Sequence, residues 1–578
     1  MYIPDLQPIG GSLLWSALIA ALPLLTVFIT LGVLRWRAHW AGLSGLAVAL
    51  AVAIAAYQMP AHLALLSGTE GFVFGLFPIM WIVVNAIWLY ELTVASGRFE
   101  DLRRVINGIS DDPRIQAIII AFCFGGLLEA LAGFGAPGAI TGVMLMAVGF
   151  TAMRAAAVVL LANTAPVAFG AIATPIITAG KLTGIDYHQI GAMVGHQTPI
   201  LALFVPLLLV LIADGKRGVR QVWPIALVVG LVFAVTQWVS ATFISVELTD
   251  IIASLAGLAA AVIMLRFWQP AGGAVAYERM CGERAREEAE LGDFLEPGGR
   301  SQIVARGGGS SSGGARAVVE RATPAAGPIG TTRTLLALFP YLLVIAVFSL
   351  AKLVPPIRDF LASTDVVIRW PGLDGQILTA AGKVSTSTQY AFGWLSNPGT
   401  LLLICGVVVA LVYRLQLSEA AAIWGRNVVK MRYSILTVAS VLALAYVMNQ
   451  SGQTITIGTW IAGAGAAFAF LSPILGWLGT AVTGSDTSAN ALFATLQQTA
   501  ATKAGIDPTL LIAANTAGGV VGKMISPQNL TIAAAAISRP AAEPELLRRV
   551  FGYSIAMLLL LCVLVYLQST PVLAWMIS

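Results

Sequence analysis

Charged side chains are scarce in this chain of 578 residues. Lys, Arg, Asp and Glu together make up 11% of the sequence, whereas 58% of the residues are hydrophobic. Soluble domains carry about 25% charged residues, so the composition excludes an ordinary soluble domain and indicates a membrane protein. The net charge of +5 is small. It sits between apolar stretches and fits the bias of basic residues towards cytoplasmic loops better than a nucleic-acid surface.

Cysteine is also rare, and the two candidate catalytic residues of the chain do not lie in a known hydrolase motif. The four cysteines are scattered, without the spacing of a disulfide framework or a metal site. Neither Ser485 nor Asp486, the candidates for a membrane-embedded hydrolase, lies in a Gly-x-Ser-x-Gly or His-Glu-x-x-His motif. We therefore expect no enzyme activity, no metal and no cofactor.

Long apolar runs are abundant. A helix needs roughly 20 apolar residues to span a bilayer, and many windows qualify. Clear ones lie near residues 12–33, 40–57, 72–96, 190–212, 221–243, 249–267, 334–353, 398–413, 433–450 and 550–568. Together with broken stretches they predict an all-α polytopic membrane protein with about 12–14 membrane segments. The first run follows Asp5 and lacks a clear cleavage site of small residues, which indicates a retained helix and not a signal peptide.

Basic residues set the expected orientation. Lys and Arg cluster after the first and third spans, after the span that ends near residue 213, and before the spans that begin at 433 and 550. The connections 58–71 and 244–248 contain neither residue type. Placing the basic clusters in the cytoplasm predicts that both termini lie on the outer side of the membrane.

A short pattern occurs twice in the chain. Ala162-Asn163-Thr164-Ala165 returns as Ala514-Asn515-Thr516-Ala517, and each copy is followed by a hydroxyl residue and a proline, Thr174-Pro175 or Ser526-Pro527. Each proline comes twelve residues after its asparagine (163 to 175 and 515 to 527). Small and polar residues interrupt the apolar sequence around each copy. We expect backbone breaks or re-entrant hairpins at Gly133, Gly135, Pro137, Gly484, Gly518 and Gly519.

These interruptions point to a binding site. In hydrocarbon, broken backbone is tolerated only where protein buries it or where it lines a wet cavity. Two breaks in corresponding halves of a membrane chain are typical of the binding site of a secondary transporter. A channel or a membrane enzyme has less need of such a repeat.

The two copies are expected to run in opposite directions through the membrane. The span at 72–96 leads into a basic segment, whereas its counterpart at 433–450 follows one. The sequence thus predicts an N-terminal membrane half (1–267) with a first repeat (72–213), and a C-terminal half (334–578) with an inverted second repeat (433–568). Between them, residues 268–333 predict a cytoplasmic polar linker with a short helix and a flexible Gly/Ser-rich run.

Three charged residues lie within or beside apolar runs, which makes each a functional candidate. Lys523 suits the carboxylate of a small anion. Glu129 and Asp486 are the candidates for proton coupling. Glu129 could instead be a buried carboxyl group held neutral by desolvation, and Lys523 could be a structural partner of Asp486.

Neutral polar residues complete the predicted substrate site. Asn and Thr side chains can donate hydrogen bonds to the polar groups of a small anion and accept hydrogen bonds from them. The candidates are Asn163, Thr164, Asn515, Thr516, Ser485, Thr487 and Gln528. The two asparagines could alternatively only cap broken helix ends. From these residues alone, the sequence indicates a transporter of a small anion.

Four motifs resemble the L-lactate permease family. They are residues 114–122, 127–135, 484–488 and 522–529, and the resemblance covers essentially the whole chain outside 270–332. It implies a multi-pass symporter of the bacterial inner membrane that carries lactate, and often glycolate, together with protons. Ala489 departs from the family pattern, in which a second serine is usual. A Na⁺-coupled carboxylate transporter and an anion channel remain alternatives, and the oligomeric state stays open.

Overall fold

The computed structural model describes residues 1–578 except 132–135, 294–329, 379–383, 538, 540–541 and 578. In the described residues, nine helices are long and apolar enough to cross a membrane, or ten if the bent pair Ala152–Ala162 and Val167–Thr183 is one span. Three shorter apolar helices, Pro137–Ala147, Pro398–Val412 and Ala467–Thr483, accompany them. The expectation of a helical polytopic membrane protein is confirmed.

The N-terminal half is a continuous series of helices. They are α1 (Leu13–Ala20), α2 (Leu22–Phe28), η1 (Ile29–Val33), α3 (Ala38–Ala55), α4 (Ala61–Phe74), η2 (Gly75–Met80), α5 (Trp81–Ala95), α6 (Arg98–Asn107), α7 (Pro113–Gln116), η3 (Ala117–Phe124), α8 (Gly125–Leu131), α9 (Ala136–Ala147), α10 (Ala152–Ala162), η4 (Val167–Phe169), α11 (Gly170–Thr183), α12 (Tyr187–Val194), α13 (Thr198–Val239), η5 (Ser240–Ile244), α14 (Thr249–Phe267) and α15 (Gly273–Asp293).

The remainder of the chain adds further helices and two strands. They are α16 (Thr331–Leu353), α17 (Pro355–Ser363), β1 (Val366–Arg369), η7 (Thr386–Thr388), β2 (Gln389–Phe392), α18 (Pro398–Val412), α19 (Leu417–Ser451), α20 (Gln453–Ile461), η8 (Ala462–Ala464), α21 (Ala467–Thr483), α22 (Asp486–Ala504), α23 (Pro508–Lys523), α24 (Pro527–Ala536), α25 (Glu543–Gln568) and η9 (Ala574–Met576).

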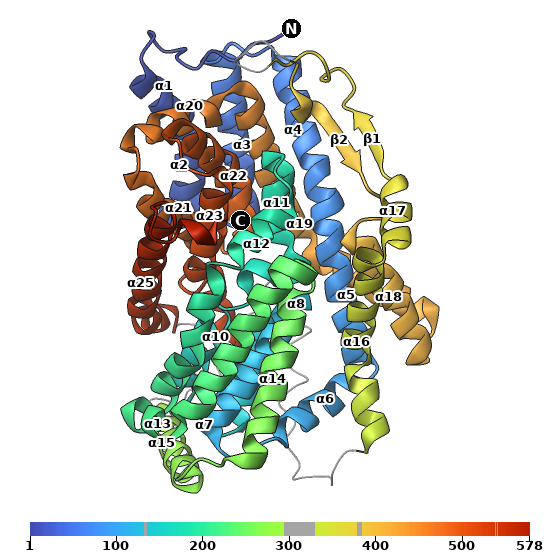
Figure 1. The fold of residues 1–578 in the computed structure, drawn as a ribbon, viewed down its shortest axis with the longest axis vertical. Helices are drawn as coiled ribbons and strands as arrows, with labels where there is room; N and C mark the ends of the chain where they lie inside the picture. Colours follow the sequence, from blue (N-terminus) through green and yellow to red (C-terminus); the bar gives the residue numbers. More distant parts are fainter. Residues whose placement is uncertain (132–135, 294–329, 379–383, 538, 540–541, 578) are drawn as a thin grey trace.

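One small sheet interrupts the helical pattern. Strands β1 and β2 pair antiparallel, with Val366 opposite Phe392, and lie at the upper right of Figure 1. The hydroxyl of Tyr390 donates to the carbonyl oxygen of Phe77 at 2.5 Å. Burial raises the pKa of Tyr390 to about 12, so this hydroxyl remains a neutral donor that ties the sheet to η2. The sequence analysis did not foresee strands in this segment.

Helix α13 folds back on itself. Its backbone leaves the helical region at Gly215, where φ is 67° and ψ is −161°. A Cβ atom built on Gly230 would lie 2.4 Å from the carbonyl oxygen of Leu203. In a straight helix these two positions would be about 40 Å apart. The element is therefore a hairpin of two antiparallel arms, in agreement with the two separate apolar runs predicted around the basic residues Lys216 and Arg217.

A layer formed by α3, α4, α5, α18 and α19, called the scaffold layer here, combines both halves of the chain. Helix α19 packs along α3, α4 and α5, and α18 packs on α5 (Figure 1). Glycine makes this close contact possible, because a Cβ atom on Gly71 would lie 2.6 Å from the carbonyl oxygen of Leu442. The indole of Trp88 donates to the carbonyl oxygen of Ala420 at 2.9 Å.

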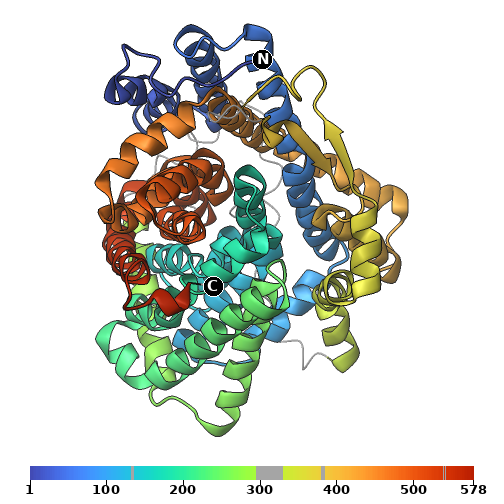
Figure 2. The same cartoon turned by 45° about the horizontal axis from the view of Figure 1, so that its top comes forward.

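A second group of helices, called the core bundle here, consists of α8–α12 and α21–α24. Helix α23 packs against α21 and α22, α22 packs on α11, and α24 packs on α9 and α10. Figure 2 shows these segments side by side although several hundred residues separate them. Because helices of one half contact helices of the other throughout, the two halves interlock.

In the described part of the core bundle, the helical backbone is interrupted at the following three places. Helix α21 ends at Gly484 with φ 77°, directly before α22. The pair α10 and α11 bends by 64°, and Ala171, Ile172 and Ala173 have positive φ values. A third interruption separates α23 from α24, which begins at Pro527 after the cap residue Ser526.

The predicted break at Gly518 and Gly519 does not occur, because α23 runs through both residues. A Cβ atom on Gly518 would lie 2.0 Å from the carbonyl oxygen of Pro473, and one on Gly519 would lie 1.9 Å from Asp486 Oδ1. These glycines therefore permit close packing of α23 against α21 and α22. The interruption falls a few residues later, after Lys523.

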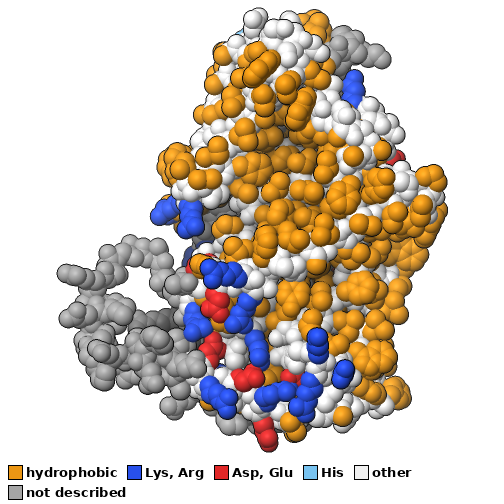
Figure 3. Space-filling model, turned by 90° about the vertical axis from the view of Figure 1, so that its left-hand side faces the viewer, with side chains coloured by type: hydrophobic (Ala, Val, Ile, Leu, Met, Phe, Trp, Pro, Cys, Tyr) orange, Lys and Arg blue, Asp and Glu red, His pale blue; other side chains and the backbone are white. Residues whose placement is uncertain are grey.

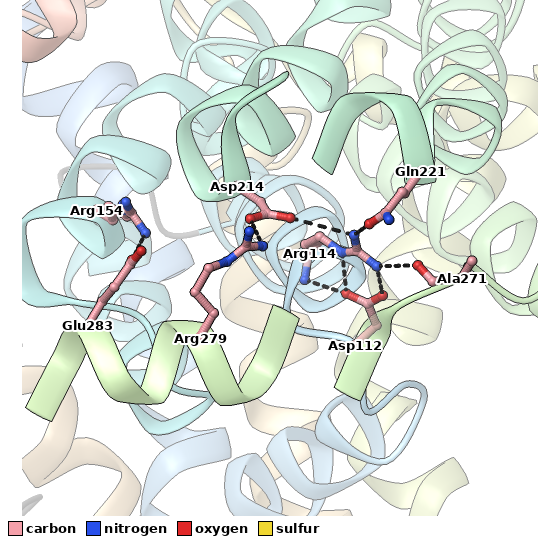
Figure 4. Close-up of polar contacts among 8 residues, drawn as sticks. All are labelled: Asp112, Arg114, Arg154, Asp214, Gln221, Ala271, Arg279 and Glu283. Carbon is pink, nitrogen blue, oxygen red and sulfur yellow. Dashed lines mark hydrogen bonds and ion pairs between the residues drawn. The ribbon is translucent and has the colours of Figure 1, made fainter. Parts of the chain in front are cut away.

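Charged groups gather at one end of the molecule, where α15 lies (Figure 3). Arg114 at the start of α7 is fully buried and pairs with Asp112 at 2.6 Å and with Asp214 at 3.5 Å. Arg279 of α15 pairs with the same Asp214 (Figure 4). Two further pairs fix α15, namely Arg154 with Glu283 and Arg539 with Glu287.

The helix foreseen in segment 268–333 is thus long and ion-paired to the bundle. The Gly/Ser-rich run of the predicted linker lies outside the described residues.

Candidate functional site

A buried ion pair joins two distant parts of the chain. Lys523 Nζ donates to Glu129 Oε1 at 2.5 Å, across 394 positions in the sequence. Glu129 lies near the end of α8 and is 2% exposed, and Lys523 ends α23 and is 7% exposed. A buried charge without a partner is costly, so the pairing offsets part of the cost of burying each group.

Asp486 occupies the same site but does not form an ion pair with Lys523. Its Oδ1 accepts a hydrogen bond from Thr480 at 3.4 Å, and its Oδ2 has no hydrogen-bond partner among the described residues. The alternative in which Lys523 serves as the partner of Asp486 is therefore replaced by the pair with Glu129. The site holds two carboxyl groups and one ammonium group.

Glycine residues seat these polar side chains. A Cβ atom on Gly170, at the start of α11, would lie 3.2 Å from Glu129 Oε1. A Cβ atom on Gly484 would lie 2.4 Å from Gln528 Oε1. Gly519 lies beside Asp486 in the same way. The side chains of Glu129, Gln528 and Asp486 thus each contact a glycine of a neighbouring segment. The interruptions and close approaches of the backbone thus converge on the charged residues.

Two cavities meet at Lys523. The first has a volume of about 410 Å³, including its open mouth, and is lined by Glu129, Val167, Gly170, Ala171, Pro175, Gly484, Ser485, Asp486, Thr487, Lys523, Gln528 and Asn529. The second, of about 340 Å³, is lined by Gly138, Val159, Leu160, Asn163, Thr164, Lys523, Met524, Asn529, Ile532 and Ala533. Eight of the ten residues predicted for substrate binding or proton coupling therefore line one or both cavities. These are Lys523, Asn163, Thr164, Ser485, Thr487, Gln528, Glu129 and Asp486.

Two helices begin beside the first cavity. Ser485 caps α22 by accepting a hydrogen bond from the backbone N–H of Ser488 at 3.3 Å. Ser526 caps α24 by accepting one from the backbone N–H of Asn529, also at 3.3 Å. The N-terminus of a helix carries partial positive charge and unpaired N–H groups, both of which favour anions. Together with Lys523 they make the cavity suitable for a carboxylate.

Asn515 and Thr516 lie apart from the cavities, although the sequence placed them in the substrate site. Both are fully buried and donate to Asn490 Oδ1 at 3.0 Å. Gln497 donates to Asn515 Oδ1 at 3.3 Å. This network ties α22 to α23, so the repeated Asn-Thr pair faces a cavity in the first copy and packs between helices in the second.

The sequence analysis missed two polar residues of this region. Asn529 lines both cavities and donates from Nδ2 to the carbonyl oxygen of Lys523 at 2.8 Å. Asn490 holds the network of α22 and α23. Both are uncharged and lie close in sequence to a charged candidate: Asn490 is one helical turn after Asp486 in α22, and Asn529 follows Lys523 by six positions across the break between α23 and α24.

The other predicted breaks have mixed outcomes. Gly133 and Gly135 lie outside the described residues. Pro137 is buried at the start of α9, where its carbonyl oxygen accepts from Thr141 at 2.8 Å. In the described part of the chain, no group of three or more His, Cys, Asp or Glu side chains could hold a metal ion.

Comparison with known proteins identifies the family. The model of the L-lactate permease family matches residues 16–572. The chain is 38% identical to the L-lactate permease of Bacillus subtilis (99% of this chain, 98% of the relative) and 38% identical to the L-lactate permease of Escherichia coli K12 (98% of each). It is also 38% identical to the glycolate permease GlcA of Escherichia coli K12, over 97% of each chain. These proteins are permeases and not enzymes, and this multi-pass membrane protein belongs to the L-lactate permease family.

Proposed function

We propose that the protein imports L-lactate, and also glycolate or related 2-hydroxy monocarboxylates, together with protons across a bacterial inner membrane. The relatives named as lactate and glycolate permeases support this substrate class. The observation that supports the coupling is the Lys523–Glu129 pair, because both residues line the first cavity and Lys523 also lines the second.

The ion pair offers a simple means of coupling. The carboxylate of the substrate and the carboxylate of Glu129 compete for the single ammonium group of Lys523. When Glu129 takes up a proton it no longer holds a negative charge, so Lys523 becomes available to the substrate. An anion and a proton then enter together, and the total charge of the site stays unchanged, which avoids the cost of moving a net charge through the bilayer.

Neutral groups would recognise the rest of the substrate. Asn163 and Thr164 line the second cavity, and Ser485, Thr487 and Gln528 line the first. Their amide and hydroxyl groups can both donate to and accept from a 2-hydroxyl group. Asp486 is the second candidate for a proton carrier, because one of its oxygen atoms has no hydrogen-bond partner among the described residues.

We further propose that access to the site alternates between the two sides of the membrane, by means of two inverted repeats, 72–213 and 433–568. Each repeat belongs to one half of the chain, residues 1–267 or 334–578, and the cytoplasmic segment 268–333 connects the halves. Two larger cavities, which different segments of the chain line, support two access routes. One of about 910 Å³ is lined in part by Lys181, Tyr187 and Asp365, and one of about 1470 Å³ in part by Asp112 and Tyr277. Substrate would reach the Lys523 site from one end and leave it towards the other.

Transport by purified protein in liposomes tests the proposal. Labelled lactate should accumulate against its gradient when the outside is made acidic, without Na⁺, and unlabelled glycolate should compete. Uptake that is independent of the pH gradient but requires a Na⁺ gradient would contradict the proposal and indicate a Na⁺-coupled transporter. Equilibration without uphill accumulation under either gradient would indicate a channel.

A further inference from the structure

A third buried carboxyl group, Asp250, lies close to the proposed proton site. It stands in the first turn of α14 and is fully buried. Its Oδ1 accepts from Gln237 Nε2 of α13 at 2.8 Å, and the same amide group also donates to the carbonyl oxygen of Ala165 at 3.2 Å. Gln237 thus links Asp250 to the broken segment between α10 and α11.

Helices α14 and α8 bring Asp250 and Glu129 onto facing surfaces. The two helices pack together, and a Cβ atom on Gly126 would lie 2.7 Å from Ser254 Oγ. Ser254 is one helical turn after Asp250, and Gly126 is one turn before Glu129.

Four oxygen atoms at this contact have no hydrogen-bond partner among the described residues. They are Asp250 Oδ2, Gln237 Oε1, Ser254 Oγ and Glu129 Oε2. In the described part of the chain, Asp250 also forms no ion pair, although a buried carboxylate without a cation is costly. A proton on Asp250 removes this cost, whereas a proton on Glu129 releases Lys523.

A series of polar groups connects the cavity of about 910 Å³ with the segment that directly precedes α14. Tyr187 lines that cavity, and its hydroxyl donates to Glu247 Oε1 at 2.7 Å. Ser245 donates to Glu247 Oε2 at 2.8 Å. Glu247 is buried and lies three positions before Asp250, in the segment that directly precedes α14.

We propose that Asp250 is a further proton-carrying residue, which passes protons between Glu247, the partner of the cavity-lining Tyr187, and Glu129. In one transfer a proton leaves the carboxyl group of Asp250 and reaches the carboxylate of Glu129. The negative charge moves in the opposite direction, and Asp250 is protonated again from the side of Glu247. This inference rests on the proton coupling proposed above, and it assigns a residue to the route of the proton.

Asp250→Asn tests the inference, because asparagine preserves the size and the hydrogen bond to Gln237 but cannot carry a proton. The variant should exchange labelled for unlabelled lactate at a rate near that of the parent. Uptake driven by a pH gradient should fall by at least about tenfold, since a positioned acid or base contributes a factor of about 10²–10⁴ to proton transfer. Asp250→Glu, which titrates, should restore part of the uptake.

Ser254→Ala is the matched control, since it removes an unpartnered polar group from the same helix face without removing a titratable one. It should keep both exchange and uptake. If Asp250→Asn retains pH-driven uptake at the parental rate, the inference is overturned. If a folded Asp250→Asn protein loses exchange as well as uptake, the role of Asp250 is structural and the inference is equally overturned. Absence of pH-driven uptake in the parent would overturn the proposed function itself, a distinguishable result.

Discussion

Lys523 is the residue on which the proposed substrate binding and the proposed proton coupling both depend. It faces Glu129 at 2.5 Å, and it borders the two cavities where a substrate carboxylate would bind. One ammonium group cannot satisfy two buried carboxylates equally well. Protonation of Glu129 and binding of the anion should therefore support each other.

Lys523→Ala should weaken lactate binding and also destabilise the fold. A charge-assisted hydrogen bond contributes about 1.5–3 kcal/mol, so we expect roughly a ten- to hundredfold loss of affinity. Removing one partner of a buried ion pair costs about 3–5 kcal/mol of stability, because Glu129 is left without its partner. Binding of labelled lactate and thermal unfolding measure the two effects separately.

The double variant Lys523→Ala, Glu129→Gln is the control for this experiment. It removes both charges, so much of the thermal stability should return while lactate binding stays weak. A double variant that binds lactate as tightly as the parent would show that Lys523 has a structural role only.

Glu129→Gln alone should separate exchange from coupled uptake. Glutamine retains the shape and can still accept a hydrogen bond from Lys523, but it cannot release a proton. Exchange of labelled for unlabelled lactate should persist, since exchange moves no net protons, whereas uphill uptake under a pH gradient should be lost. If both activities survive, the proton site lies elsewhere, with Asp486 the next candidate. If both are lost in a folded protein, Glu129 acts directly in binding or gating.

At the scale of single elements, α23 depends on glycine for its position. A Cβ atom on Gly518 would lie 2.0 Å from the carbonyl oxygen of Pro473, and one on Gly522 would lie 2.2 Å from that of Trp477. Both obstacles are backbone atoms of α21, so they cannot rotate away. The close approach holds Lys523, at the end of α23, beside Glu129.

Gly518→Ala should therefore destabilise the protein even though alanine favours helices. Overpacking of this kind costs about 1–3 kcal/mol, which thermal unfolding of the purified protein would detect. Gly552→Ala in α25 is the matched control, because a Cβ atom on Gly552 would meet no other atom within 4 Å and alanine should be neutral or stabilising there. Equal melting temperatures for the two variants would contradict the close-packing role of Gly518.

The elements also show which features the sequence could predict. Glu129, Asp486 and Lys523 stand out because a charge in or beside an apolar run has few explanations other than function. The pairing of Lys523 with Glu129 could not be foreseen, since a repeat aligns positions but gives no distance between them. A glycine within an apolar run can mark either a break in a helix or a close contact between helices. Gly484 marks a break and Gly518 a close contact, and only the packing of the folded chain distinguishes them. The network around Asn490 could not be predicted, because an uncharged amide occurs in helices in many roles and its position alone does not indicate which one it has.

At the scale of the whole molecule, the two halves are not separate bodies. Helix α19 lies among α3, α4 and α5 in the scaffold layer, and α24 lies against α9 and α10 in the core bundle. The Glu129–Lys523 pair joins both halves inside the core bundle. If access alternates as proposed, we expect the core bundle to move against the scaffold layer, because rocking of one half against the other would disrupt both contacts.

The orientation of the molecule gives a test at this scale. The N-terminus and α15 lie at opposite ends (Figure 1), and the bias of basic residues predicts cytoplasmic placement of the end with α15. In a variant without native cysteines, Gln7→Cys and Trp575→Cys should react with a membrane-impermeant thiol reagent added to intact cells. Ala285→Cys, at an exposed position of α15, should react only after the cells are permeabilised. Labelling of Ala285→Cys in intact cells would place the ion-paired α15 outside and reverse the direction of both proposed access routes, so that Tyr187 and Glu247 would supply protons from the cytoplasm.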